Sequence, residues 1–118
     1  MQAPDNEFTS FIREHGFVAY PEGSLAEQGM GNKIDAYVSG DLALRVVYDR
    51  GQRFIDLSIF NSNNWRDVFS LSAEIDSEFN AKTGSFSESL KALNKYWPQI
   101  SAALRTNHSS QHNGGSSI

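Results

Sequence analysis

The chain of 118 residues has no cysteine, only three prolines and no apolar run that approaches the length of a membrane span. Without cysteine it forms no disulfide and offers no thiolate, and a zinc finger would lack its usual ligands. The first residues, Met1-Gln2-Ala3-Pro4-Asp5, lack the basic and apolar regions of a signal peptide. We therefore expect a cytoplasmic, soluble protein that does not enter a membrane.

Basic residues are also few, because ten Lys and Arg stand against fourteen Asp and Glu, for a formal net charge of −4. Nucleic-acid binding normally needs a basic stripe that releases counterions, so we expect no nucleic-acid partner. An acidic surface suits a basic protein partner, since complementary charge speeds encounter. Mild acidity also aids solubility without any partner.

The most informative positive feature is the segment 42–59, where two runs alternate apolar and polar residues around the turn Arg50-Gly51. A two-residue loop at this turn predicts a β-hairpin, with glycine where a positive φ is needed. The aliphatic pairs fall on one face, and an arginine opposite an aspartate falls on the other. The facing pairs are Asp49–Gln52, Val47–Phe54, Val46–Ile55, Arg45–Asp56, Leu44–Leu57 and Leu42–Ile59.

Hydrophobic spacing along the chain predicts an α+β fold, a three- or four-stranded antiparallel meander with an N-terminal helix and two or three C-terminal helices on one face. The expected strands span 17–20, 33–39, 42–48 and 53–60, and an exposed loop spans 22–32. Two of the expected helices span 5–15 and 65–77, the second with Asn64 as N-cap. A third follows the N-cap Ser87, and we expect a kink or a break in it near 95–97, with Pro98 opening a final short helix. We expect residues 1–105 to form one domain and residues 106–118 to form a flexible polar tail.

Groups suited to catalysis are scarce in this sequence. Of the three histidines, only His15 lies in the expected domain, at a helix end where a cation favours the helix dipole. No glycine pattern resembles a phosphate loop, and the acids do not converge. We therefore expect no enzyme activity, no cofactor and no metal. The enzymatic alternative is a small hydrolase or nucleotide-binding protein with a site near Asp35, Arg45 and Asp56.

Two groups of residues are candidates for binding a protein partner. The first is the Arg45–Asp56 pair with Val47 and Phe54 beside it, because an uncovered sheet face of this kind can act as a recognition surface. Such a pair also commonly does no more than stabilise a sheet, by about 0.2–1 kcal/mol. The second group is Trp65 and Arg66, residue types that often carry interface energy, although Trp65 could equally cap the core at a helix start.

The segments Leu44–Leu57, Trp65-Arg66-Asp67 and Gly16-Phe17 carry a family resemblance. In a group of small uncharacterised bacterial proteins, an Asp-Arg-Gly/Ser-Gln turn lies between two such strands, and a Trp-x-Asp step follows. Over residues 8–75 the chain resembles this group, which is similar to the immunity proteins of toxin systems. The resemblance implies no catalytic residues. Together with the small size, the acidity and the scarcity of catalytic groups, it predicts a non-enzymatic inhibitor that neutralises a toxin by association, with a basic toxin domain as the candidate partner. The alternative is a structural or adaptor module that self-associates through an exposed sheet face or edge strand.

Overall fold

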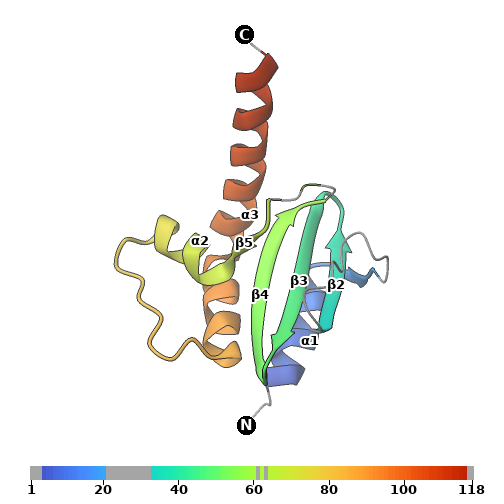
Figure 1. The fold of residues 1–118 in the computed structure, drawn as a ribbon, viewed down its shortest axis with the longest axis vertical. Coiled ribbons are helices and arrows are strands. Elements are labelled where there is room, and N and C mark those ends of the chain that lie inside the picture. The colour runs from blue at the N-terminus through green and yellow to red at the C-terminus, as the bar shows by residue number, and fades with distance from the viewer. Residues whose placement is uncertain (1–3, 21–32, 61, 63, 117–118) are drawn as a thin grey trace.

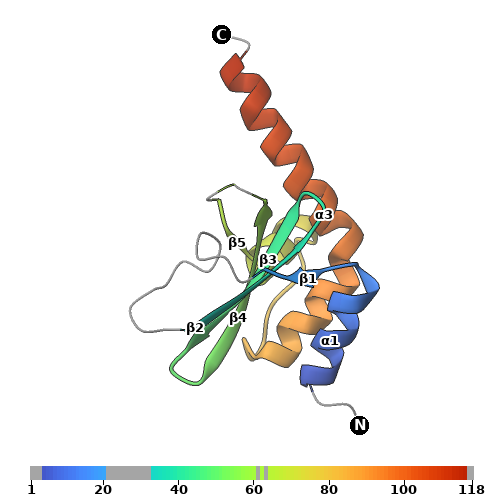
Figure 2. The same cartoon turned by 90° about the vertical axis from the view of Figure 1, so that its right-hand side faces the viewer.

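The computed structural model describes residues 4–20, 33–60, 62 and 64–116. Five antiparallel strands in the order β1-β2-β3-β4-β5 form one sheet, and the described helices share a core on one side of it (Figure 1 and Figure 2). The α+β class is therefore confirmed. The elements are α1 (Pro4–Glu14), β1 (Val18–Ala19), β2 (Lys33–Ser39), β3 (Leu42–Asp49), β4 (Gln52–Ile59), β5 (Arg66–Asp67), α2 (Val68–Ile75) and α3 (Phe86–Ser116).

The β3–β4 hairpin has the register that its alternation predicts, and all six facing pairs given above are confirmed. Arg50 and Gly51 both have positive φ, 53° and 84°, as a two-residue loop of type I′ requires. The β2–β3 turn at Gly40-Asp41 is equally tight and pairs Tyr37 with Leu44. These two turns fix which side chains of the three long strands face the helices.

The hydrophobic core lies between the helices and one face of the sheet, which we call the inner face. The hairpin supplies the inner-face aliphatic residues that alternation predicts, and each helix contributes apolar side chains from one stripe. The almost fully buried members include Phe11, Leu44, Val46, Ile55, Leu57, Val68, Leu71, Leu90, Leu93 and Ile100.

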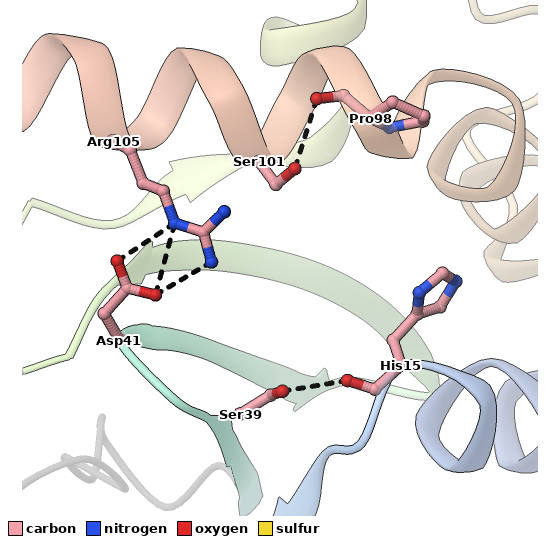
Figure 3. A network of polar contacts seen from close by, with 6 residues as sticks. All are labelled: His15, Ser39, Asp41, Pro98, Ser101 and Arg105. Atoms are coloured by element: carbon pink, nitrogen blue, oxygen red, sulfur yellow. Dashed lines mark hydrogen bonds and ion pairs between the residues drawn. The ribbon is translucent and has the colours of Figure 1, made fainter.

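Two polar contacts fasten the β2–β3 turn to the helical layer (Figure 3). The Arg105 guanidinium donates to both carboxylate oxygens of Asp41, from Nε at 3.0 and 3.2 Å and from Nη2 at 2.8 Å. The Ser39 hydroxyl donates to the main-chain oxygen of His15 at 2.8 Å. The turn is therefore held by α3 on one side and by the end of α1 on the other.

The helix starts differ from those expected. Residues 66–67 form β5 and pair with Leu57 and Asp56, so the helix expected from Trp65 begins at Val68. Its N-cap is Asp67, not Asn64, because the Asp67 Oδ2 accepts from the amides of residues 69 and 70 at 3.0 and 3.1 Å. Helix α3 starts at Phe86, and the hydroxyl of Ser85, not that of Ser87, accepts from the Glu88 amide at 3.1 Å.

Helix α3 passes through Pro98 as one element, so there is no break near residues 95–97 and no separate helix opens at Pro98. A proline removes one helical hydrogen bond, but buried Leu93 and Ile100 anchor the helix on both sides of it. The helix continues to Ser116 across the segment expected as a tail, and Figure 1 shows this end projecting beyond the sheet. No proline follows Pro98, and each added residue gains a helical hydrogen bond.

The expected loop and the expected absence of a membrane span can be checked only in the described residues. The loop expected at 22–32 lies outside them, so it stays a prediction. Within the described part of the chain, no helix has the length and apolar character needed to cross a membrane.

Candidate binding surface on the outer sheet face

The sheet face opposite the helices, which we call the outer face, carries three cross-strand rows set by the register. Because side chains alternate along each strand, neighbours in a row lie side by side on this face. The middle row contains the predicted ion pair, and the row nearer the β3–β4 turn is wholly apolar. The rows are Val18–Val38–Ala43–Ser58, then Ala36–Arg45–Asp56–Asp67, then Ile34–Val47–Phe54.

The Arg45–Asp56 pair lies near the centre of the outer face, where the sequence places it. Arg45 Nε donates to Asp56 Oδ2 at 3.1 Å, and the two side chains are only 19% and 18% exposed. Burial raises the pKa of the Asp56 carboxyl, the Arg45 hydrogen bond and charge oppose that rise, and the Asp67 charge adds to it. The pair is thus largely removed from water, unlike an ordinary surface ion pair.

Trp65 covers this pair from the segment that leads into β5. The Arg45 Cζ lies 4.4 Å from the centre of the Trp65 ring, at cation–π distance. Trp65 does not begin a helix and does not join the inner core; it packs with the outer-face residues Ala36 and Ala43. The arginine is therefore held between a carboxylate and an aromatic ring.

Small residues at one end of the outer face make room for aromatic side chains from the flanking segments. Ala36 and Ala43 are buried beneath Tyr20, Phe60 and Trp65, and the Tyr20 and Phe60 rings meet edge to face at 5.4 Å. No helical residue belongs to this cluster. The outer face thus has its own small core at the end near Phe60.

The apolar row Ile34–Val47–Phe54 lies on the other side of the ion pair, towards the β3–β4 turn, and all three side chains are half-buried. At the β1 margin of the outer face, Val18 is 61% exposed. An apolar row beside an aromatic-capped arginine has the composition common at the centre of protein interfaces. We call Ile34, Arg45, Val47, Phe54, Asp56 and Trp65 the outer-face patch.

Arg66 does not belong to this patch. It pairs with Leu57 in the sheet, so its side chain leaves from the inner face, and it forms an ion pair with Glu74 of α2. Five of the six residues expected at the binding surface, Arg45, Val47, Phe54, Asp56 and Trp65, therefore lie together, and Arg66 lies apart from them.

The outer face is acidic in balance. Among the described residues, three carboxylates leave its rows or their ends, those of Asp49, Asp56 and Asp67. Two guanidinium groups oppose them, that of Arg45 in the middle row and that of Arg50, which lies 4.0 Å from Asp49 at the turn. Asp67 also caps α2. A face with this balance has the charge that a basic partner needs.

Trp65 is expected at this surface from the sequence, whereas Tyr20, Phe60 and Asp67 are not. The alternation of Ala36 with Tyr37 and Val38 places that alanine on the outer face, but no local pattern shows which ring covers it. Tyr20, Phe60 and Trp65 follow or precede strands, and their packing depends on the order of strands in the sheet.

Metal-ligand clusters and the surroundings of His15 bear on the enzymatic alternative. No group of three or more His, Asp or Glu among the described residues could hold a metal ion. His15 packs against the rings of Phe11 and Trp97, with centroids 4.4 and 5.3 Å away, at the end of α1. In comparisons with known proteins, no family model, no curated protein and no solved structure matches the chain.

Proposed function

We propose that this chain is a non-enzymatic, immunity-like binding protein of the bacterial cytoplasm, which neutralises a toxin by associating with a basic toxin domain. The outer-face patch is its binding surface. The observation that carries the proposal is the half-buried apolar row Ile34–Val47–Phe54 beside the Arg45–Asp56 pair, on a face to which no described helix contributes a core residue.

The patch suits tight association for two physical reasons. Five of its six side chains stand on the three long strands β2, β3 and β4, so little conformational entropy is lost when a partner binds. Its centre combines an arginine, a tryptophan and a phenylalanine, and aromatic residues with arginine are enriched in the cores of interfaces. The acidic balance of the face favours a basic partner and raises the association rate at low salt.

The test is co-purification of the full chain with the products of the neighbouring genes, followed by titration calorimetry with any that bind. Phe54→Ala should weaken binding at least about tenfold, because truncation of an aromatic residue at the centre of an interface commonly costs about 2 kcal/mol of binding free energy. Phe69→Ala is the matched control, because it removes the same side chain from a half-buried position on α2. Circular dichroism confirms that both variants fold.

Two results would contradict the proposal. If no neighbouring product binds, the immunity-like function is wrong. If a product binds but Phe54→Ala and Phe69→Ala change its affinity equally, the protein binds through another surface.

Self-association is the second candidate function, favoured by the short strand at the β4 edge. Strand β5 pairs with β4 only at Asp56 and Leu57, so among the described strands residues 52–55 have β3 as their only neighbour. Exposed edge strands can pair with another copy. A monomer at high concentration in sedimentation velocity would exclude this function and leave the first one intact.

A further inference from the structure

A groove of about 530 Å³ lies between α1 and α3, away from the outer face. Figure 2 shows the two helices side by side on the helical side of the sheet. The buried side chains of Phe11 and Leu90 form its floor. Its walls carry charges separated by sign, with Glu7 and Glu14 on α1, and Lys91 and Lys95 on α3.

Helical geometry places these charges in two rows. Glu7 and Glu14 are seven residues apart, so they project from the same side of α1 about 10 Å from each other. Lys91 and Lys95 are four residues apart and neighbours on one side of α3, about 6 Å from each other. The groove therefore has an anionic wall and a cationic wall, and Glu14, Lys91 and Lys95 are exposed.

No ion pair joins the two walls among the described residues. Bulky side chains keep the helices apart, since the Phe11 ring meets the Trp97 ring edge to face at a centroid distance of 5.2 Å. Lys95 Nζ lies 5.3 Å from the centre of the Tyr96 ring, but no ion pair with a described residue holds any of the four wall charges. Both rows can therefore form ion pairs with a third group.

We propose that this groove binds a helix of a partner protein that carries basic residues on the flank towards α1 and acidic residues on the flank towards α3. Charge complementarity to the two walls selects such a helix over one with a single sign of charge. Both helices run in the same direction in Figure 1 and Figure 2, so their dipoles favour an antiparallel occupant. The groove and the outer-face patch would then be separate docking surfaces on opposite sides of the sheet.

The test uses three stapled helical peptides with the same alanine and leucine seam and the full chain in fluorescence anisotropy. One peptide carries Lys on one flank and Glu on the other, the second carries Lys on both, and the third carries Glu on both. We expect the mixed peptide to bind about tenfold more tightly than either of the others at low salt, because exposed ion pairs contribute little singly but four act together.

Charge removal on one wall gives a second readout. Glu7→Gln with Glu14→Gln should weaken the mixed peptide about three- to tenfold and strengthen the Glu-flanked peptide. The matched control is Asp49→Asn with Glu78→Gln, which changes the net charge equally at exposed or half-buried sites outside the groove. Lys91→Gln with Lys95→Gln should weaken the mixed peptide and strengthen the Lys-flanked one.

The proposal is overturned if the mixed peptide binds no better than the two single-charge peptides. It is also overturned if the control pair changes affinity as much as the groove pair, because net charge alone would then explain binding. Neither outcome depends on the outer-face patch, whose residues are unchanged in the groove variants.

Discussion

Replacement of Arg45 by methionine should destabilise the protein far more than an ordinary surface substitution. The variant keeps most of the side-chain volume but leaves the Asp56 carboxylate, 18% exposed, without its 3.1 Å partner and close to Asp67. Loss of one partner from a fully buried pair costs 3–5 kcal/mol, so a pair that keeps about a fifth of its surface should lose about 2–3 kcal/mol at pH 7. Urea unfolding followed by circular dichroism measures this free energy.

The pH dependence of the same variant tests the cause. The pKa of Asp56 is already raised by burial, so the folded protein binds more protons than the unfolded chain in the range just above the ordinary aspartate pKa. Stability from this group is therefore lost as pH rises through that range. Without the guanidinium the pKa should rise further, so the deficit of Arg45→Met should shrink as pH falls from 7 towards 4.

Arg50→Met is the matched control for this prediction. Arg50 is 95% exposed and lies 4.0 Å from its own neighbour Asp49, so its loss should cost less than about 0.5 kcal/mol. If Arg45→Met costs no more than Arg50→Met, or if its deficit is the same at pH 4 and pH 7, the Arg45–Asp56 pair does not compensate a desolvated carboxylate as argued.

Three further predictions concern single residues. Glu88 accepts hydrogen bonds from the amides of residues 82, 83 and 84, and the first of these is the largest cause that lowers the pKa of Glu88 from 4.5 to about 2. The stability that this carboxylate contributes is lost as pH falls through that range. Glu88→Gln should therefore lower the unfolding free energy at pH 6 but not near pH 2, measured by urea unfolding. The Arg105 hydrogen bond lowers the pKa of Asp41, so Arg105→Gln should return that pKa towards its ordinary value in an NMR titration. Gly51 has φ of 84°, so Gly51→Ala should lower the unfolding free energy by about 1 kcal/mol, measured in urea.

The hairpin and the ion pair could be predicted from the sequence because both depend on local rules. A period of two assigns each residue of 42–49 and 52–59 to a face, and a two-residue turn then sets every facing pair without knowledge of the rest of the fold. The same rules place Val47 and Phe54 on the outer face beside Arg45 and Asp56.

The errors arose where tertiary contacts decide the local structure. Strand β5 has only two residues, too few for a period, and it exists because the backbone of residues 66–67 pairs with β4. Asp67 could have been recognised as an N-cap by residue type, but Asn64 has the same preference. Arg66 and Trp65 are adjacent in sequence, but Arg66 belongs to β5 and pairs with the inner-face residue Leu57, whereas Trp65 precedes the strand and packs on Ala36 and Ala43 of the outer face.

The position of the outer-face patch follows from the sizes of its neighbours in the sheet. Ala36 and Ala43 are too small to fill the outer face alone, so the rings of Trp65, Tyr20 and Phe60 pack over them and form a second layer of side chains at that end. The larger Ile34, Val47 and Phe54 receive no helical cover and stay half-buried beyond the ion pair. Trp65 covers the Arg45 guanidinium. Val47 of the apolar row is two residues from Arg45 on the same face of β3, so a partner that fits the row also meets this covered arginine. Larger residues at positions 36 and 43 would displace the Trp65 ring and expose the Arg45–Asp56 pair to water. Both the pKa of Asp56 and the affinity of the outer-face patch for a partner would then fall.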